Sequence, residues 1–98
     1  MTITAIELLE NAGMHMQDRA STYDQPGGER SMGKTVEAFN AITGRELSES
    51  EGWLLLDLLK QVRLFAAPGY HADSAEDHIA YAALMAEAKA RENQNNAT

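Results

Sequence analysis

The sequence predicts an all-α fold, a four-helix domain. Three observations carry this prediction. Apolar residues recur at helical spacing in four segments, capping patterns precede three of these segments, and no segment shows the alternation of a strand. A chain of 98 residues is too short to divide into two domains with separate cores. We therefore expect one domain over residues 1–92, followed by a polar, disordered tail over residues 93–98.

The first helix is expected over residues 4–20. Thr4 and Glu7 have the spacing of a capping box, in which each side chain bonds the other residue's backbone. One face of this helix carries apolar or small residues at steps of three or four: Ile6, Leu9, Gly13, Met16 and Ala20. The following segment, residues 23–28, is rich in turn-forming residues and predicts a loop of defined shape.

The other three helices are expected over residues 30–42, 49–66 and 74–92. Gly44 stands where a left-handed residue would end the second helix. Ser48 with Glu51, and Ser74 with Asp77, have capping spacing for the third and fourth helices. The third helix is expected to supply most of the bulky core: Trp53, Leu55, Leu56, Leu59, Val62 and Phe65.

Composition excludes several classes of protein. Eight Lys and Arg against fifteen Asp and Glu give a net charge of −7, which argues against non-specific DNA binding. With no cysteine, the chain has no disulfide, zinc–thiolate site or thiol nucleophile. The sequence shows neither a long apolar run nor a basic leader, so we expect a cytoplasmic protein without membrane association. Since a chain this small encloses a large site only with a second subunit, we expect a homo-oligomer, with a dimer favoured.

Residues 28–35 match the phosphate-loop pattern G-x-x-x-x-G-K-[ST]. A phosphate loop of that class follows a buried strand, whereas the residues preceding this match have helical periodicity, so we do not predict a P-loop nucleoside triphosphatase. Two alternatives stay open. In the first, a phosphate or carboxylate binds at the start of the second helix, held by Arg30, Lys34 and the nearby glycines. In the second, the segment is a solvated first turn of that helix.

Charged residues also gather where the third and fourth helices meet. Lys60 and Arg63 follow Asp57 at steps of three, and three acids open the fourth helix: Asp73, Glu76 and Asp77. One alternative is a cluster of ion pairs at the helix junction. The other is a divalent cation held by the three acids, because hard cations prefer carboxylate ligands. Neither His71 nor His78 has a nucleophile with a known local signature, so no catalytic residue is assigned.

An ordered set of motifs runs through most of the chain: Arg19-x-x-x-Tyr23-x-x-Pro26, Glu29 to Val36, Ala38-Phe39-Asn40-x-Ile42-Thr43-Gly44, Leu59-Lys60-x-x-Arg63, and Ala72-Asp73-Ser74-x-x-Asp77-x-x-x-Tyr81-Ala82. Together, over about residues 15–90, they resemble a family of small uncharacterised phage and prophage proteins. That family is distantly similar to MazG-type nucleotide pyrophosphohydrolases, all-α oligomers that present an E-x-x-E pair and a later E-x-x-D pair to magnesium. In this chain Glu46-x-x-Glu49 stands at the start of the third helix, and the later pair is Asp73-x-x-Glu76 or Asp73-x-x-x-Asp77.

The leading hypothesis is therefore a phage or prophage accessory protein that binds a nucleotide or phosphate ligand, or a host protein, without turnover. The expected ligand-binding residues form one patch that joins the loop and the start of the second helix to the helix junction: Tyr23, Glu29, Arg30, Lys34, Asn40, Lys60 and Arg63. One alternative is a MazG-like hydrolase with Mg²⁺ on Asp73, Glu76 and Asp77; no other cofactor is expected. A further alternative is an acidic interaction module that inhibits a host replication or defence protein.

Overall fold

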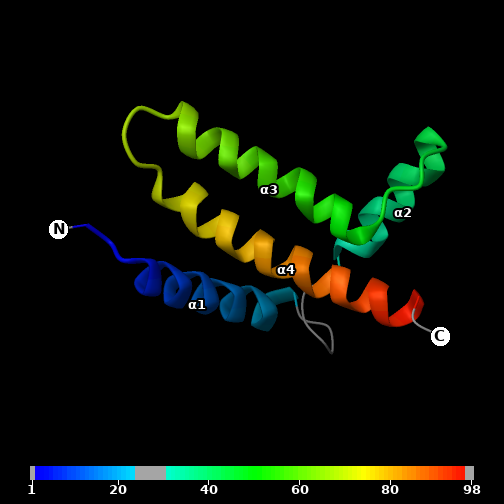
Figure 1. Ribbon diagram of the computed structural model, residues 1–98, viewed down its shortest axis with the longest axis horizontal. Coiled ribbons are helices and arrows are strands. Elements are labelled where there is room, and N and C mark those ends of the chain that lie inside the picture. The colour runs from blue at the N-terminus through cyan, green and yellow to red at the C-terminus, as the bar shows by residue number, and fades with distance from the viewer. Residues whose placement is uncertain (1, 24–30, 97–98) are drawn as a thin grey trace.

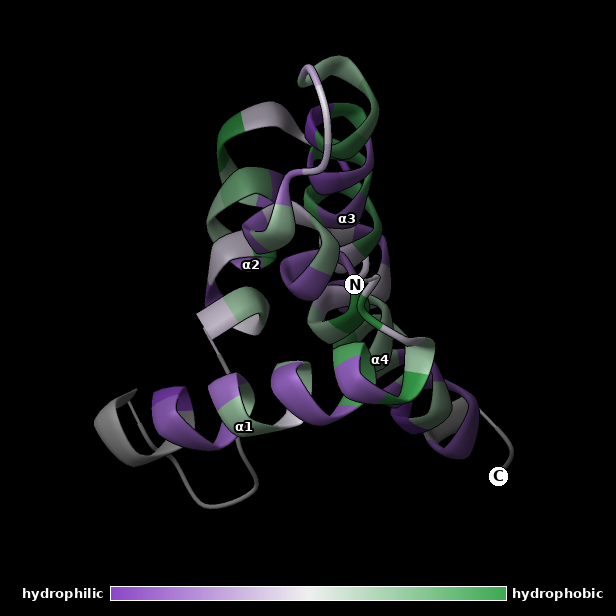
Figure 2. Ribbon diagram, turned by 90° about the vertical axis from the view of Figure 1, so that its left-hand side faces the viewer, coloured by the Kyte–Doolittle hydropathy of each residue, from purple (hydrophilic) through white to green (hydrophobic). Residues whose placement is uncertain are grey.

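The computed structural model describes residues 2–23 and 31–96, and it confirms the all-α prediction. The four helices of this part are α1 (Ala5–Tyr23), α2 (Ser31–Thr43), α3 (Glu49–Ala66) and α4 (Ala72–Asn96). In Figure 1, α3 and α4 form an antiparallel pair, and α2 packs at the beginning of α3. Figures 1 and 2 both place α4 between α3 and α1, so α4 is the central helix.

Two helices begin at the predicted capping boxes. Before α3, Ser48 N–H donates to Glu51 Oε1 at 2.9 Å and Glu51 N–H donates to Ser48 Oγ at 3.1 Å. Before α1, Glu7 N–H donates to Thr4 Oγ1 at 3.1 Å, and the Thr4 N–H donates back to Glu7 Oε1 at 3.4 Å. Each box satisfies backbone donors that the first helical turn leaves free, which explains why these two boundaries were predictable.

The predicted cap of α4 is wrong. The helix begins at Ala72, and Ser74 lies inside its first turn with no exposed surface. His71 takes the capping position, because its Nδ1 accepts the Ser74 N–H at 3.3 Å and lies 2.5 Å from the Ser74 hydroxyl. At its other end α4 continues to Asn96, so residues 93–96 of the predicted tail are helical.

The helix ends around α3 are fixed by local and long-range bonds. α2 ends at Thr43 and is followed by Gly44, whose φ of 74° is the left-handed conformation that glycine adopts without steric cost. The Glu92 carboxylate, near the end of α4, accepts both the backbone N–H of Ser50 at 3.0 Å and its hydroxyl at 2.8 Å. The last turns of α4 therefore hold the first turn of α3.

The core is small and lies where α2, the first half of α3 and α4 meet. The Trp53 and Tyr81 rings pack with their centroids 5.5 Å apart. Its buried members are Met32, Val36, Trp53 and Ala88, with Leu47, Leu56, Tyr81, Leu84 and Met85 partly buried against them. A Cβ added at Gly52 would lie 2.5 Å from Met32 Sδ and 2.7 Å from Val36 Cγ1, so α2 packs directly on the α3 backbone.

The predicted core face of α1 is only partly correct. Ile6 and Leu9 are exposed, whereas Ala12 is buried and Leu8 and Met16 are half-buried. Among the described helices α1 packs on α4, and its buried residue is the small Ala12. A helix with a single neighbour buries a narrow stripe, so the flanking apolar positions stay in solvent.

Candidate functional site

The inner face of α3, which packs on α4, carries a buried carboxylate. Asp57 is 2% exposed, and its Oδ1 lies 2.5 Å from Nδ1 of His78 in α4. Gln61 Nε2 donates to the other carboxylate oxygen at 3.3 Å. Since an ionised carboxylate only accepts hydrogen bonds, His78 Nδ1 is the donor and the imidazole orientation is fixed. Asp57 and His78 therefore tie the two helices together.

A second polar pair follows one turn later along α3. Lys60 Nζ lies 2.7 Å from Asp77 Oδ2 and 5.9 Å from the centroid of the Tyr81 ring. This pair agrees with the ion-pair alternative for the helix junction. The ammonium group expected to hold phosphate is thus already bonded to a carboxylate of its own chain. Arg63, the other predicted cation of this region, is exposed.

The three predicted metal ligands have different surroundings. Glu76 Oε2 lies 3.3 Å from His15 Nδ1 of α1, Asp77 faces Lys60, and Asp73 is exposed in the first turn of α4. Within residues 2–23 and 31–96, no group of three or more His, Asp and Glu side chains is arranged to hold a metal ion. A magnesium site on all three acids would require these side chains to be rearranged.

On the other side of the molecule, Asn40 has a structural role in the connection between α2 and α3. Its Nδ2 donates to the Leu47 carbonyl at 2.9 Å, and its Oδ1 accepts the Leu47 N–H at 2.8 Å. Lys34 is exposed in the first turn of α2. The side chains of three other predicted ligand-binding residues lie outside the described part: Tyr23, Glu29 and Arg30.

The described ligand-binding candidates form two separate groups. Gly33, beside Lys34, lies against Glu49 at the start of α3, since a Cβ there would be 3.1 Å from Glu49 Oε1. Lys60 comes eleven residues after Glu49 in α3, which corresponds to about 16 Å along the axis of that helix. Lys34 and Lys60 are therefore not brought to one patch.

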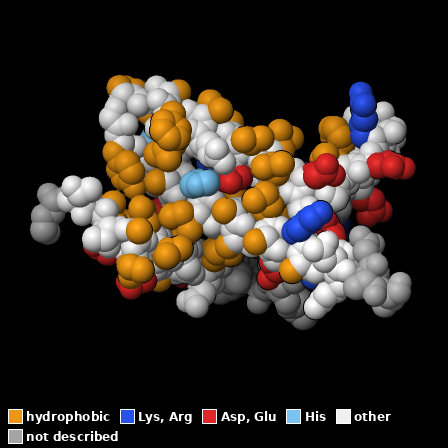
Figure 3. Space-filling view, in the orientation of Figure 1, with side chains coloured by type: hydrophobic (Ala, Val, Ile, Leu, Met, Phe, Trp, Pro, Cys, Tyr) orange, Lys and Arg blue, Asp and Glu red, His pale blue; other side chains and the backbone are white. Residues whose placement is uncertain are grey.

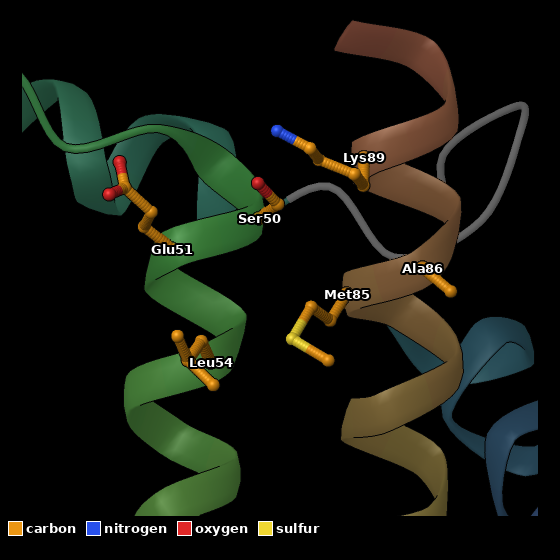
Figure 4. Close-up of a pocket in the computed structure, with 6 residues that line it drawn as sticks. All are labelled: Ser50, Glu51, Leu54, Met85, Ala86 and Lys89. Carbon is orange, nitrogen blue, oxygen red and sulfur yellow. The ribbon is translucent and has the colours of Figure 1, made fainter. Parts of the chain in front are cut away.

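A groove of about 330 Å³ lies between the first turns of α3 and the last turns of α4 (Figure 4). Met85 points from α4 toward α3, and Lys89 reaches across toward Ser50 and Glu51. The groove is lined by Ser50, Glu51, Leu54, Met85, Ala86 and Lys89. The pKa of Glu51 is lowered mainly by the hydrogen bond from the Ser48 backbone and, to a smaller extent, by the hydrogen bond with the Ser48 side chain. The nearby Lys89 ammonium lowers it further. Glu51 is thus held as a carboxylate beside a mostly apolar groove.

The largest departure from the sequence prediction is the opposite face of α3. Six bulky residues of α3 are exposed, each by between 42% and 86% of its surface. Four of them were expected in the core, and that prediction is wrong for Leu55, Leu59, Val62 and Phe65. The six residues form what we call the outer stripe: Leu54, Leu55, Leu58, Leu59, Val62 and Phe65. Figure 3 shows hydrophobic side chains along α3, while the charged groups on that side of the molecule gather toward α2. Within residues 2–23 and 31–96, α3 therefore has an apolar face that is largely exposed to solvent.

The outer stripe was missed although its residues were recognised as apolar. α3 is apolar on two sides: Trp53 and Leu56 pack in the core, and the outer stripe faces solvent. Helical periodicity detects such residues but does not tell which side meets a neighbour. The usable signal was the polar set on the same helix, because Asp57 and Lys60 share the side of Trp53 and not the side of Leu58 and Val62.

Comparisons with protein-family models, with curated proteins and with solved structures found no match to this chain. Among the residues that the structure describes, no helix is both long enough and apolar enough to cross a membrane. The outer stripe, the groove beside it and the polar pairs behind it are therefore the features on which a function can be argued.

Proposed function

We propose that this protein acts by binding another protein chain, without turnover, and that the outer stripe of α3 is the binding surface. The observation that carries the proposal is the exposure of six bulky apolar residues on one face of a single helix. Contiguous apolar surface of that size is costly in water and is typical of an interaction site. The sequence resemblance supplies the setting, a phage or prophage accessory protein in the host cytoplasm.

The stripe suits an amphipathic helix as its partner. Leu55, Leu58, Val62 and Phe65 follow one another at steps of three, four and three residues. This is the spacing with which one helix packs its apolar side chains between those of another. The stripe extends over about 15 Å, or three helical turns, so a partner segment of similar length would cover it.

The contacts of the polar candidates favour a protein partner over a nucleotide. Lys60 is paired with Asp77, and both ends of the Asn40 amide bond to the backbone of Leu47. Asp77 already neutralises the Lys60 charge, and Leu47 fixes the orientation of the Asn40 amide, so neither group is held ready for a phosphate. The acids of the hydrolase alternative, Asp77 and Glu76, likewise face Lys60 and His15, whereas the apolar stripe needs no rearrangement. A net charge of −7 is also compatible with the acidic interaction module.

A site-specific photo-crosslinking residue tests this proposal in the cells that produce the protein. It replaces Leu58 on the stripe in one variant and Ile6 of α1 in the control, because Ile6 is 63% exposed and lies on another helix. We expect protein adducts, identified by mass spectrometry, at Leu58 and not at Ile6. A second variant that adds Val62→Asp should lose them, since a buried unpaired charge opposes docking.

Equal adduct yields at Leu58 and Ile6, or adducts that survive Val62→Asp, would contradict the proposed binding surface. The "without turnover" part has its own assay, which measures pyrophosphate release from a panel of nucleoside triphosphates with Mg²⁺. Turnover that disappears with Asp77→Asn would replace this proposal by the MazG-like alternative.

A further inference from the structure

We infer that the chain covering the outer stripe is a second copy of this protein. The two α3 helices pack antiparallel through their outer stripes, about a two-fold axis that crosses α3 at the level of Lys60. The inference rests on the proposed function, because it names the occupant of the same surface. Four observations favour a second copy: the register of the stripe, its area, its lack of charge and the small core of the single chain.

The register of the stripe is self-complementary. Lys60 is the midpoint both of Leu55 and Phe65 and of Leu58 and Val62. An antiparallel copy centred there places Leu55 against Phe65 of the second copy, and Leu58 against Val62 of the second copy. These are the alternating layers of an antiparallel pair of helices, in which each contact occurs twice. One stripe therefore provides both sides of the interface.

The area of the stripe is close to what a stable dimer needs. With about 200 Å² for each fully exposed large apolar side chain, the exposed fractions of its six residues amount to roughly 700 Å². A standard interface takes about 800 Å² from each partner. The α3 stripe alone supplies most of that amount, and the apolar part of the neighbouring groove, which shares Leu54, extends it.

Charge does not oppose the pairing, although each chain carries −7. Three charged residues lie within the stretch covered by the stripe: Asp57, Lys60 and Arg63. Asp57 and Lys60 lie on the other side of α3 and are bonded to His78 and Asp77 of α4, and the exposed Arg63 falls at the level of Asp57 of the second copy in this register. Two stripes therefore meet without bringing like charges into contact. Acidic groups elsewhere on the chains stay in solvent, where salt screens them.

The small core of the single chain favours a partner that is always present. Among the described residues, the buried hydrophobic side chains are Ala12, Met32, Val36, Trp53, Ala75 and Ala88, and half of them are alanine. The stripe exposes more bulky apolar residues than this core buries. Such a chain gains much of its stability from a permanent interface, and a second copy is available wherever the protein is made.

Sedimentation and native mass spectrometry of the full chain test the occupant. We expect twice the 10.7 kDa chain mass for the wild type, and a dissociation constant raised at least ~100-fold by Leu58→Gln with Val62→Gln, because both lie at the interface centre. Ile6→Gln is the matched control and should leave the dimer mass unchanged. A monomeric wild type at ~100 µM, far above the dissociation constants of stable dimers, would overturn the inference. So would a dimer that the double variant leaves intact.

Cysteine pairing tests the register and does not depend on the double variant folding. The chain has no cysteine, so each introduced thiol is the sole one in its chain. Mixing Leu55→Cys with Phe65→Cys protein under mild oxidation should give mainly the mixed disulfide. Disulfides that form equally in either variant alone would indicate a parallel pair and contradict the two-fold at Lys60.

The outcomes separate this inference from the proposed function. A monomer that still gives Leu58-specific adducts with a different protein keeps the binding function and rejects the second copy. A dimer with the mixed disulfide, whose Leu58 adducts contain this chain alone, supports the second copy and rejects a host partner at the stripe.

Discussion

The inner and outer faces of α3 differ in a way that reverses the usual pattern of a surface helix. The inner face, toward α4, combines Trp53 with the buried Asp57 and the paired Lys60. The outer face carries bulky aliphatic and aromatic residues and is open to solvent. The inner pairs fix how α3 and α4 align, since hydrogen bonds and charges are directional, whereas the outer face is shaped for apolar contact. The difference indicates two neighbours, one within the chain and one outside it.

Trp53→Ala should have the largest effect on the inner face. Removing the ring empties the contact with Tyr81 and leaves a cavity, so we expect a loss of about 3–5 kcal/mol in the free energy of unfolding. Urea denaturation at several protein concentrations measures it. Leu55→Ala on the outer face is the matched control, and its loss should fall as the protein is diluted toward the monomer. Equal and concentration-independent losses in both variants would remove the distinction between the faces.

Asp57→Ala should cost about 2–3 kcal/mol, because it leaves the donors of His78 and Gln61 without their acceptor at a buried position. Asp57→Asn keeps one acceptor oxygen and should cost less than half as much. Chemical denaturation followed by circular dichroism gives both values. If the alanine variant were as stable as the wild type, the inner face would not depend on its buried carboxylate.

Lys60→Met tests a more exposed pair of the same face. The Lys60 side chain is 16% exposed and that of Asp77 is 38% exposed, so solvent screens their attraction. We expect a loss below about 1 kcal/mol. A double-mutant cycle with Asp77→Asn isolates the coupling of the two charges. A coupling as large as the Asp57→Ala effect would show that the two inner pairs contribute equally.

Glu51→Gln should have the smallest effect, and it should depend on pH. The pKa of Glu51 lies below its ordinary value of 4.5, mainly because of the Ser48 backbone hydrogen bond. Its stabilising contribution is therefore complete above pH 4.5 and is lost as the pH falls through the lowered pKa. We expect the wild type to exceed the variant in stability at pH 7 and to match it at about pH 2. A difference that persists in acid would assign the effect to packing.

The sequence predicts the helices well because their signals are local. The Ser48 and Glu51 box lies within four residues and determines where α3 begins whatever packs against it. The cap of α4 was assigned incorrectly because His71 fills a role in which Ser, Thr, Asp and Asn are usual. Local spacing thus predicts that a helix begins, and unusual capping chemistry shifts the residue at which it does.

The candidate site was harder to predict because it depends on how helices are arranged. Lys34 and Lys60 were expected in one patch, yet α2 packs at the start of α3, about 16 Å along the axis from Lys60. The exposure of Leu58 and Val62 likewise follows from α4 packing on the opposite face. Neither fact is encoded in spacing along the chain, because both follow from which neighbour each helix finds.

The bonds between Ser50 and Glu92 also affect how the molecule opens. Because they join residues 42 positions apart, the first turn of α3 and the last turns of α4 cannot fray independently. Helix ends ordinarily exchange their amide hydrogens fastest, through openings that cost little free energy. In this chain the Ser50 amide should exchange slowly, at a rate set by the joint opening of both helices. A helix end that is usually the loosest part of a fold becomes part of a cooperative unit.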